Sequence, residues 1–137
     1  MAVESSHAVN PNVYEKSPYN PVKDFAPISN LADVPNVLVV NPELPAKNME
    51  QFTQLLKSNP GKFAFGSSGN GGLSHMNGEL FMSVTGTKML HVPYKGLGPA
   101  LNDLVAGQLQ VVFDNIPSSF ALIQGQRIRP LVVAAKE

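Results

Sequence analysis

The sequence predicts an α/β domain with a mainly parallel, mixed sheet flanked by helices. From residue 35 onward, short β-branched runs alternate with amphipathic stretches of helical period, and glycine or proline stands at most of the boundaries. The links between these segments are short. Four strand-to-helix alternations of this kind favour parallel strands, because a helix carries the chain back to the end at which the next strand begins.

The first predicted strand is Asn36 to Asn41, a β-branched run between two prolines. A helix is expected next, from Asn48 as its N-cap to the Asn59-Pro60-Gly61 stop. Further strands are predicted at 62–65, 88–92, 109–113 and 129–134. The helices between them are expected from near Ser74 to Gly86, over 100–105 and over 120–124. The first of these presents an apolar face of Leu73, Met76, Leu80, Phe81 and Val84.

With 137 residues the chain has the size of one domain. Residues 1–25 contain the turn-forming pairs Asn10-Pro11, Ser17-Pro18 and Asn20-Pro21 and no sustained apolar period. They are predicted to be an irregular connecting segment. The packed α/β unit is expected over residues 26–137.

Charge and composition exclude several classes of function. The 10 basic side chains balance 10 acidic ones, and the two arginines, Arg127 and Arg129, stand near the end of the chain, so nucleic acid is not an expected partner. The lack of cysteine excludes disulfides and thiolate metal sites. No apolar run approaches the roughly 20 residues that span a bilayer. The segment Met1 to His7 lacks the basic and apolar regions of a signal peptide, so the chain as written is expected to be cytoplasmic.

The segment Gly66 to Gly72 is the strongest candidate for a ligand site. It joins a predicted strand to a predicted helix, and parallel sheets bind ligands beyond the carboxyl ends of their strands. Its glycines let the backbone approach a ligand, and the helix start supplies free N–H groups and about half a positive charge. We expect an anion to lie against the backbone amides between Ser68 and Gly72. The expected binding residues are Ser67, Ser68, Gly69, Asn70, Gly71 and Gly72.

Two alternatives to this anion site are a plain structural turn and a nucleotide loop. The glycines could serve only to make a tight strand-to-helix connection. A nucleotide loop fits poorly, because Leu73 stands where a phosphate-binding loop has lysine and Ser74 stands where the dinucleotide pattern has its last glycine.

Two further loops follow predicted strands and open on the same edge of a parallel sheet. One contains Tyr94, Lys95 and Gly96, and the other begins with Asp114 and Asn115. Lys95 could offset the charge of a carboxylate, or it could be a solvated surface charge. Asp114 is expected to cap the following helix, so Asn115 is the better candidate for a polar ligand contact.

Catalytic and metal-binding functions have little support in the sequence. Ser67 or Ser68 could join His75 or His91 and Asp114 in a hydrolase triad, but Asn70 breaks the G-x-S-x-G pattern of a nucleophile elbow. We therefore expect no enzyme activity. The histidines show no ligand pair at i, i+4 spacing, so no metal or other cofactor is expected. His91, inside an apolar strand, is predicted to be a core histidine.

Motifs along nearly the whole chain resemble the solute-binding receptors of tripartite tricarboxylate transporters, the TctC or Bug-type receptors. Near the N-terminus these are Ser6-His7-Ala8-Val9-Asn10-Pro11, Tyr19-Asn20-Pro21-Val22-Lys23-Asp24-Phe25 and Pro35-Asn36-Val37-Leu38-Val39-Val40-Asn41. Further along they are Asn59-Pro60-Gly61-Lys62, Gly66-Ser67-Ser68-Gly69-Asn70-Gly71, Gly78-Glu79-Leu80-Phe81, His91-Val92-Pro93-Tyr94-Lys95-Gly96 and Phe113-Asp114-Asn115.

The resemblance implies a periplasmic receptor whose two α/β lobes close on a carboxylate and deliver it to a membrane permease. This chain resembles the second lobe, with the fold of one lobe of a type II periplasmic binding protein. Di- and tricarboxylates are the expected ligands, with amino acids and aromatic acids as further candidates. The sequence shows neither a first lobe nor a closing segment after Glu137, so we expect a truncated form or a fragment. The alternative function is a self-associating module that pairs through its exposed lobe-facing surface and binds little ligand.

Overall fold

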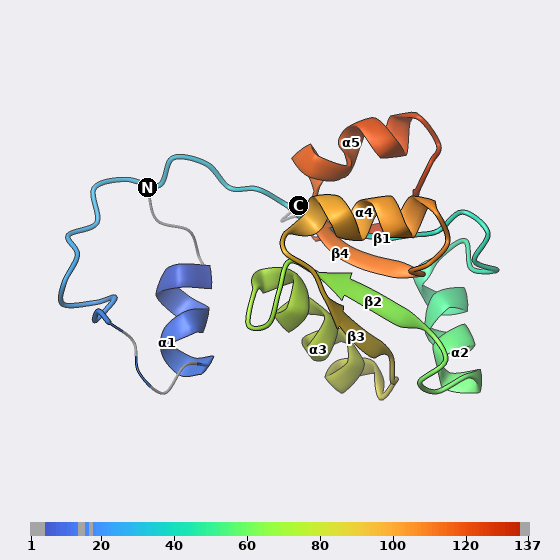
Figure 1. The fold of residues 1–137 in the computed structure, drawn as a ribbon, viewed down its shortest axis with the longest axis horizontal. Coiled ribbons are helices and arrows are strands. Elements are labelled where there is room, and N and C mark those ends of the chain that lie inside the picture. Colours follow the sequence, from blue (N-terminus) through green and yellow to red (C-terminus); the bar gives the residue numbers. More distant parts are fainter. Residues whose placement is uncertain (1–4, 14–15, 17, 135–137) are drawn as a thin grey trace.

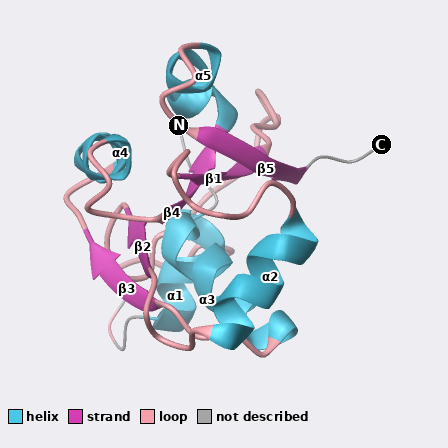
Figure 2. Ribbon diagram, turned by 90° about the vertical axis from the view of Figure 1, so that its right-hand side faces the viewer, coloured by secondary structure: helices cyan, strands magenta, loops and turns pink. Residues whose placement is uncertain are grey.

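A five-stranded sheet carries the fold, and its strands follow the order β3-β2-β4-β1-β5. The computed structural model describes residues 5–13, 16 and 18–134. Figure 1 shows the sheet between two pairs of helices, α2 with α3 and α4 with α5, and Figure 2 shows the same three layers from the side. The strands are β1 (Asn36–Val40), β2 (Ala64–Ser67), β3 (Leu90–Pro93), β4 (Val111–Asn115) and β5 (Arg129–Ala134). The helices are α2 (Met49–Ser58), α3 (Leu73–Thr85), α4 (Leu97–Val105) and α5 (Ile116–Gln124).

The sheet is mixed and mainly parallel, as predicted. β2 pairs in parallel with β3 and with β4, whereas β1 pairs antiparallel with β4 and with β5. One strand therefore runs against the other four. β2, β3 and β4 start two residues later than predicted, because strand pairing begins at Ala64, Leu90 and Val111.

Each face of the sheet has its own apolar core. On one face, α2 and α3 cover a cluster that includes Phe52, Leu56, Phe65 and Phe113. On the other face, α4 and α5 cover a cluster that includes Leu101, Leu104 and Val112. Neighbouring residues of a strand point to opposite faces, so Phe65 and Ser67 of β2 face α3 while Ala64 and Gly66 face α4. Gly66 must be small, because a Cβ there would lie 2.6 Å from Leu109 Cδ1.

Helix α3 forms where predicted, but it turns a different face to the sheet. Its buried residues are Ser74 and Gly78, while Leu80 is 63% exposed and Val84 is 77% exposed. The expectation that Leu73, Met76, Leu80, Phe81 and Val84 share the packed face was wrong for Met76, Leu80 and Val84. The small residues face the sheet because the ring of Phe65 already fills the space beneath the helix.

The crossover connections explain why the helices divide between the two faces. From β2 the chain crosses over α3 to the outer strand β3, and it then returns over α4 past β2 to β4. A right-handed crossover that reverses its direction along the sheet must use the opposite face. The connections that leave β2 and β4 therefore go to opposite faces, and the carboxyl ends of these neighbouring strands form the topological switch point of the sheet, where open α/β sheets bind their ligands.

The N-terminal part of the chain lies apart from the sheet. The segment predicted to be irregular contains a π-helical turn (Ser5–Val9) that continues into α1 (Asn10–Val13). An extended arm then leads to β1, at the left in Figure 1, and the side chains of Ile28 and Leu31 on it are exposed. The first strand of the sheet, β1, begins at Asn36. None of the helices that the structure describes is long and apolar enough to cross a membrane.

Candidate functional site

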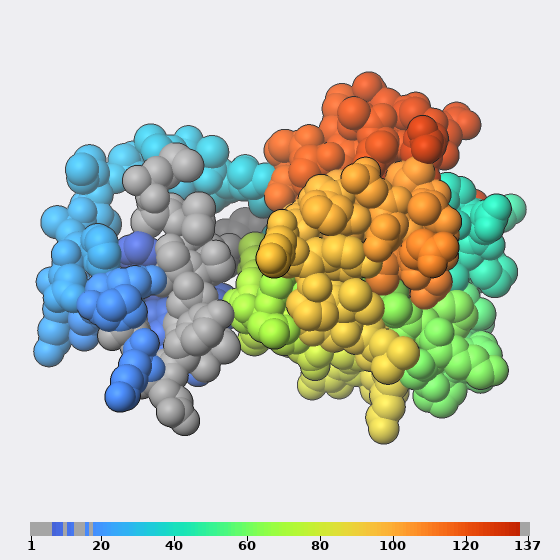
Figure 3. Space-filling view, viewed as in Figure 1, coloured from blue at the N-terminus to red at the C-terminus, as the bar shows by residue number. Residues whose placement is uncertain are grey.

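The predicted binding residues lie at the carboxyl ends of β2, β3 and β4 and in the loops that follow them. Because these strands are parallel, the loops that follow Ser67, Pro93 and Asn115 open on one edge of the sheet. Figure 3 shows the loop after β2 (yellow-green) beside the start of α4 (gold) on the surface that faces the N-terminal arm. β1 enters the sheet at the same edge, since Asn36 pairs with Asn115.

The glycine loop, residues 68–72, is held by hydrogen bonds within the protein. The N–H of Ser68 donates to Ser74 Oγ at 2.9 Å, and the N–H of Gly69 donates to Ser67 Oγ at 3.2 Å. The N–H of Gly71 donates to His75 Nδ1 at 3.1 Å. Gly71 has a φ of 74°, a left-handed conformation that suits glycine.

The free donors of the loop therefore lie further along than predicted. We expected the amides between Ser68 and Gly72 to face an anion, but those of Ser68, Gly69, Gly71 and Gly72 already have acceptors. In the part of the chain that the structure describes, no acceptor bonds the N–H groups of Leu73, Ser74 and His75. These amides form the first turn of the 13-residue helix α3, where the helix dipole favours an anion.

Two histidine rings support the loop from the α3 side. His75 of α3 stacks on His91 of β3 with ring centroids 3.9 Å apart, and His91 stacks on Phe65 at 4.9 Å. His91 Nε2 lies 2.6 Å from Ser67 Oγ. Burial lowers the pKa of His91, and the neighbouring His75 lowers it further, while Glu79 acts in the opposite direction. His91 was predicted to be a core histidine, but it is only partly buried, and its ring contacts the hydroxyl group of Ser67 at the start of the loop.

These contacts do not assemble a hydrolase triad. Ser67 and His91 lie on the α3 face of the sheet, whereas Asp114 lies on the α4 face, because Gly66 pairs with Val112. The Asp114 carboxylate instead accepts hydrogen bonds from the hydroxyl groups of Ser118 and Ser119. Ser67 is also completely buried, so a substrate could not reach its hydroxyl.

The loop after β3 contributes a hydrogen-bonded tyrosine, Tyr94, and an exposed lysine, Lys95. Tyr94 donates its phenolic O–H to Asp103 Oδ2 at 2.7 Å, and its backbone N–H donates to Ser67 O at 3.0 Å. Burial and this hydrogen bond raise the pKa of Tyr94 to about 12. Lys95 is exposed, and Gly96 adopts a φ of 103° as it begins α4. Lys95 therefore places an exposed cationic side chain in the loop that follows β3.

Asn115 caps α5, and the neighbouring Asp114 bonds to side chains in the first turn of this helix. Asn115 is its N-cap, with Oδ1 accepting from the N–H of Ser118 at 3.2 Å. Asp114 is buried and accepts from the N–H of Asn115 at 2.7 Å as well as from the two serine hydroxyls. The prediction that Asp114 caps this helix was therefore wrong: Asn115 is the N-cap, and the Asp114 carboxylate bonds the N–H of that residue and two serine hydroxyls instead. The amide oxygen of Asn115 is occupied by the cap, which leaves its NH₂ group as the donor for a ligand.

The sequence reasoning missed the side chains that hold the loop. Ser74 and His75 stand four to six residues after their backbone partners, a separation that a loop running into a helix turn can close. A polar residue in the first turn of a helix after a glycine loop could have indicated them. His91 gives no local signal, because only the pairing of β2 with β3 brings it to Ser67.

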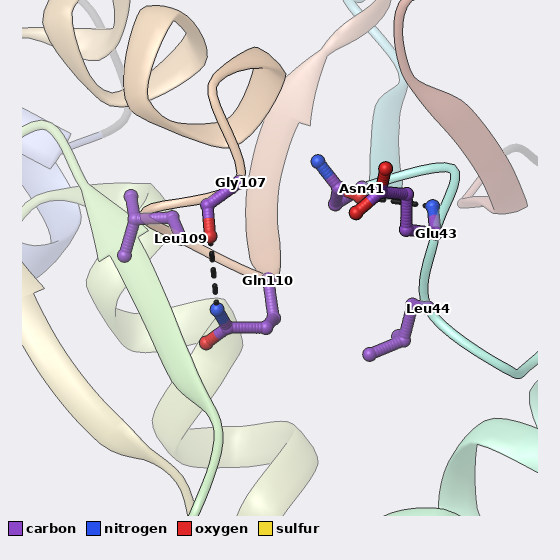
Figure 4. A pocket seen from close by; sticks show the side chains of 6 residues that line it. All are labelled: Asn41, Glu43, Leu44, Gly107, Leu109 and Gln110. Carbon is purple, nitrogen blue, oxygen red and sulfur yellow. Dashed lines mark hydrogen bonds between the residues drawn. The ribbon is translucent and has the colours of Figure 1, made fainter.

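Two pockets lie at the other end of the sheet. One of about 170 Å³ is shown in Figure 4 and is lined by Asn41, Glu43, Leu44, Gly107, Leu109 and Gln110. The side chain of Asn41 is already bonded to Leu104 O and to the N–H of Glu43. A wider recess near the start of β3 lies at that end too. Because open parallel sheets bind ligands at the carboxyl ends of their strands, we assign the candidate site to the glycine loop rather than to these pockets.

A metal centre has no support in the described residues. Over residues 5–13, 16 and 18–134, no group of three His, Asp or Glu side chains lies close enough together to hold a metal ion.

Comparison with known proteins gives consistent matches. The tripartite tricarboxylate transporter family receptor model matches residues 1–137. The protein BugT of Bordetella pertussis is 33% identical over 130 residues, which cover 95% of this chain and 40% of BugT. The chain thus spans less than half the length of this relative.

Solved structures agree with this match. One described as a periplasmic transporter has a TM-score of 0.90 and 49% identity, over 96% of this chain and 44% of that one. An R. palustris protein solved with adipate has a TM-score of 0.90 and 36% identity, over 97% of this chain and 44% of that one. The fold is that of one lobe of these periplasmic binding proteins. The chain belongs to the family of tripartite tricarboxylate transporter receptors, which are periplasmic solute-binding proteins.

Proposed function

We propose that this chain forms one face of a binding site for a small carboxylate, in a receptor that delivers its ligand to a membrane permease of a tripartite tricarboxylate transporter. The observation that carries the proposal is the set of unbonded N–H groups of Leu73, Ser74 and His75 at the start of α3. Amides at a helix start bind carboxylates through charge-assisted hydrogen bonds. A receptor that binds and releases its ligand needs no catalytic group, so we propose no turnover.

Lys95 and Asn115 complete this face. The Lys95 ammonium adds the positive charge that offsets one carboxylate, and the Asn115 NH₂ group is a neutral donor on the neighbouring strand end. The relative solved with adipate supports a dicarboxylate as ligand. A second lobe would contribute the opposite face, so the identity of the preferred acid depends on contacts from both lobes.

The test is a titration of the ¹⁵N-labelled chain with adipate, with citrate and with the neutral diamide of adipic acid. We expect the amide signals of Leu73, Ser74 and His75 to shift with both acids and not with the diamide. Shifts confined to the pocket in Figure 4, or equal shifts with the diamide, would contradict the proposal.

A lysine pair supplies the matched control. Lys95 follows β3 at the site edge and Lys88 precedes β3 at the opposite edge, and both are exposed. Lys95→Ala should weaken adipate binding by up to about fivefold, the effect of an exposed ion pair, while Lys88→Ala should leave it unchanged. Equal effects of the two substitutions on adipate affinity would contradict a role of Lys95 in the binding site.

A separate proposal concerns self-association. Met76, Leu80 and Val84 form an exposed apolar stripe along α3, and such a face is a candidate for pairing with another copy. Sedimentation of the wild type should show a dimer that Leu80→Glu disrupts and that Asn102→Glu, at an exposed position of α4 on the opposite face of the sheet, does not. A strictly monomeric wild type at high concentration would rule the pairing out.

A further inference from the structure

The stacked pair of His75 and His91 lies directly against the glycine loop. The two rings are 14° from parallel with centroids 3.9 Å apart, and each ring makes one hydrogen bond to the segment that ends β2 and forms the loop. His75 Nδ1 accepts from the N–H of Gly71 at 3.1 Å, and His91 Nε2 lies 2.6 Å from Ser67 Oγ. The loop conformation therefore depends on both rings.

The two hydrogen bonds differ in their response to a proton. A backbone N–H can only donate, so the Gly71 contact requires an unprotonated Nδ1 on His75, with the proton of the neutral ring on Nε2. This Nε2 lies 3.5 Å from Glu79 Oε1. A proton on Nδ1 would place two donors against each other and break the Gly71 contact. A hydroxyl can donate or accept, so the Ser67 contact survives protonation of His91.

We propose that His75 is the positioning residue of the glycine loop, and that its protonation releases the Gly71 amide and loosens the loop. His75 lies in the first turn of α3, directly after the loop, and the amides of this turn face the ligand. We therefore expect a loosened loop to bind a carboxylate more weakly. This second step rests on the carboxylate site proposed above. The first step concerns only the protein itself.

Two titratable side chains, those of His91 and Glu79, face His75. His91 faces it from β3, and Glu79 lies one turn along α3. The neighbours from β2 and β4 on this face, Phe65, Ser67 and Phe113, carry no charge. Burial and the nearby His75 lower the pKa of His91, while Glu79 acts in the opposite direction. Glu79 would pair with a protonated His75, so little positive charge would be left to attract a ligand.

Two substitutions separate the hydrogen bond from the stacking. His75→Asn places an amide oxygen close to the position of Nδ1, so it keeps an acceptor for Gly71 that does not titrate. His75→Phe keeps an aromatic ring on His91 and removes the acceptor. If His75→Phe fails to fold, the comparison of wild type with His75→Asn still shows whether protonation of His75 breaks the Gly71 hydrogen bond.

The first measurement needs no ligand. Amide exchange and the chemical shift of the Gly71 N–H are followed from about pH 8 to about pH 5, the range in which histidine titrates. In the wild type, the protection of Gly71 should fall by about threefold to tenfold toward acid, the effect of one lost hydrogen bond. In His75→Asn the protection should stay constant, and in His75→Phe it should be low throughout. Constant protection in the wild type, or an equal fall in His75→Asn, would overturn the proposal.

The second measurement is an adipate titration at both ends of this pH range. Wild-type affinity should fall several-fold more than that of His75→Asn, and this comparison cancels the titration of adipate itself. Tighter wild-type binding in acid, relative to His75→Asn, would overturn the second step. If Gly71 responds to pH but adipate binds at neither end, the carboxylate site is wrong and the positioning role of His75 stands.

Discussion

The ring of Phe65 on β2 occupies the space in which a side chain on Gly78 of α3 would lie. A Cβ at Gly78 would be 2.3 Å from Phe65 Cε2, much closer than carbon atoms can approach. Phe65 is completely buried and also contacts His91 and Phe113. This contact sets the distance of α3 from the sheet and so the position of the helix start at the candidate site.

Gly78→Ala should destabilise the fold. Overpacking a core contact costs about 1–3 kcal/mol, and the better helix propensity of alanine returns at most about 1 kcal/mol. Urea unfolding should show a lower midpoint for Gly78→Ala, whereas Ser83→Ala, on the exposed side of the same helix, should be nearly neutral. Equal stability of wild type and Gly78→Ala would mean that α3 can move away from Phe65 at no cost.

The same contact explains which parts of the fold could be predicted from the sequence. In α2, Phe52 and Leu56 stand at helical spacing and are both buried, so the apolar pattern identified the packed face. In α3 the pattern is apolar on the side of Leu80 and Val84, but the sheet-facing side needs small residues because Phe65 is large. Which side of such a helix packs depends on a partner that is distant in the sequence.

In the candidate site, too, local features could be predicted from the sequence, whereas contacts with distant residues could not. A strand, a glycine loop and a helix start are local features, and the sequence located all three. The pairing of loop amides with Ser74 and His75 could not be read from composition, and it moved the free donors to Leu73, Ser74 and His75. The contact between Ser67 and His91 depends on the register of β2 against β3.

Removing the charge of Asp114 should destabilise α5 and the end of β4. Its buried carboxylate accepts from the N–H of Asn115 and from the hydroxyl groups of Ser118 and Ser119. Asp114→Asn turns one acceptor into a donor that faces other donors, at a cost of about 1–3 kcal/mol. Thermal unfolding should show the loss, while Asp33→Asn on the exposed arm should show almost none. An unchanged melting temperature of Asp114→Asn would mean that the serine hydroxyls reorient at no cost and bond the new amide group.

Tyr94 should make the fold less stable in strong alkali. The pKa of Tyr94 is raised from 10.0 to about 12, first by burial and then by its hydrogen bond to Asp103. Between these two values the unfolded chain loses the phenolic proton and the folded chain keeps it, so the free energy of unfolding falls as the pH rises through this window. Unfolding measured across the window should show a smaller fall in Tyr94→Phe. The same fall in both proteins would show that other groups cause it.

The last prediction concerns the affinity of this chain for carboxylates. A receptor with a dissociation constant of about 1 μM has roughly −8 kcal/mol of binding free energy, and an equal division between two lobes leaves about −4 kcal/mol, near 1 mM, for one. The edge of the sheet at the carboxyl ends of β2, β3 and β4 supplies one face of the site. Its helix amides, ammonium group and amide NH₂ group stay in contact with water. Competing water weakens each charge-assisted bond further.

We therefore expect adipate or citrate to bind this chain at about 1 mM or more weakly. Chemical-shift titration measures such affinities directly, and sedimentation at the same protein concentration reports the oligomeric state. A micromolar constant for the monomer would contradict the division between lobes, because one face would then supply nearly all of the binding free energy. Micromolar binding by a dimer would instead mean that the second copy closes the site, and Leu80→Glu should then weaken binding and dimerisation together.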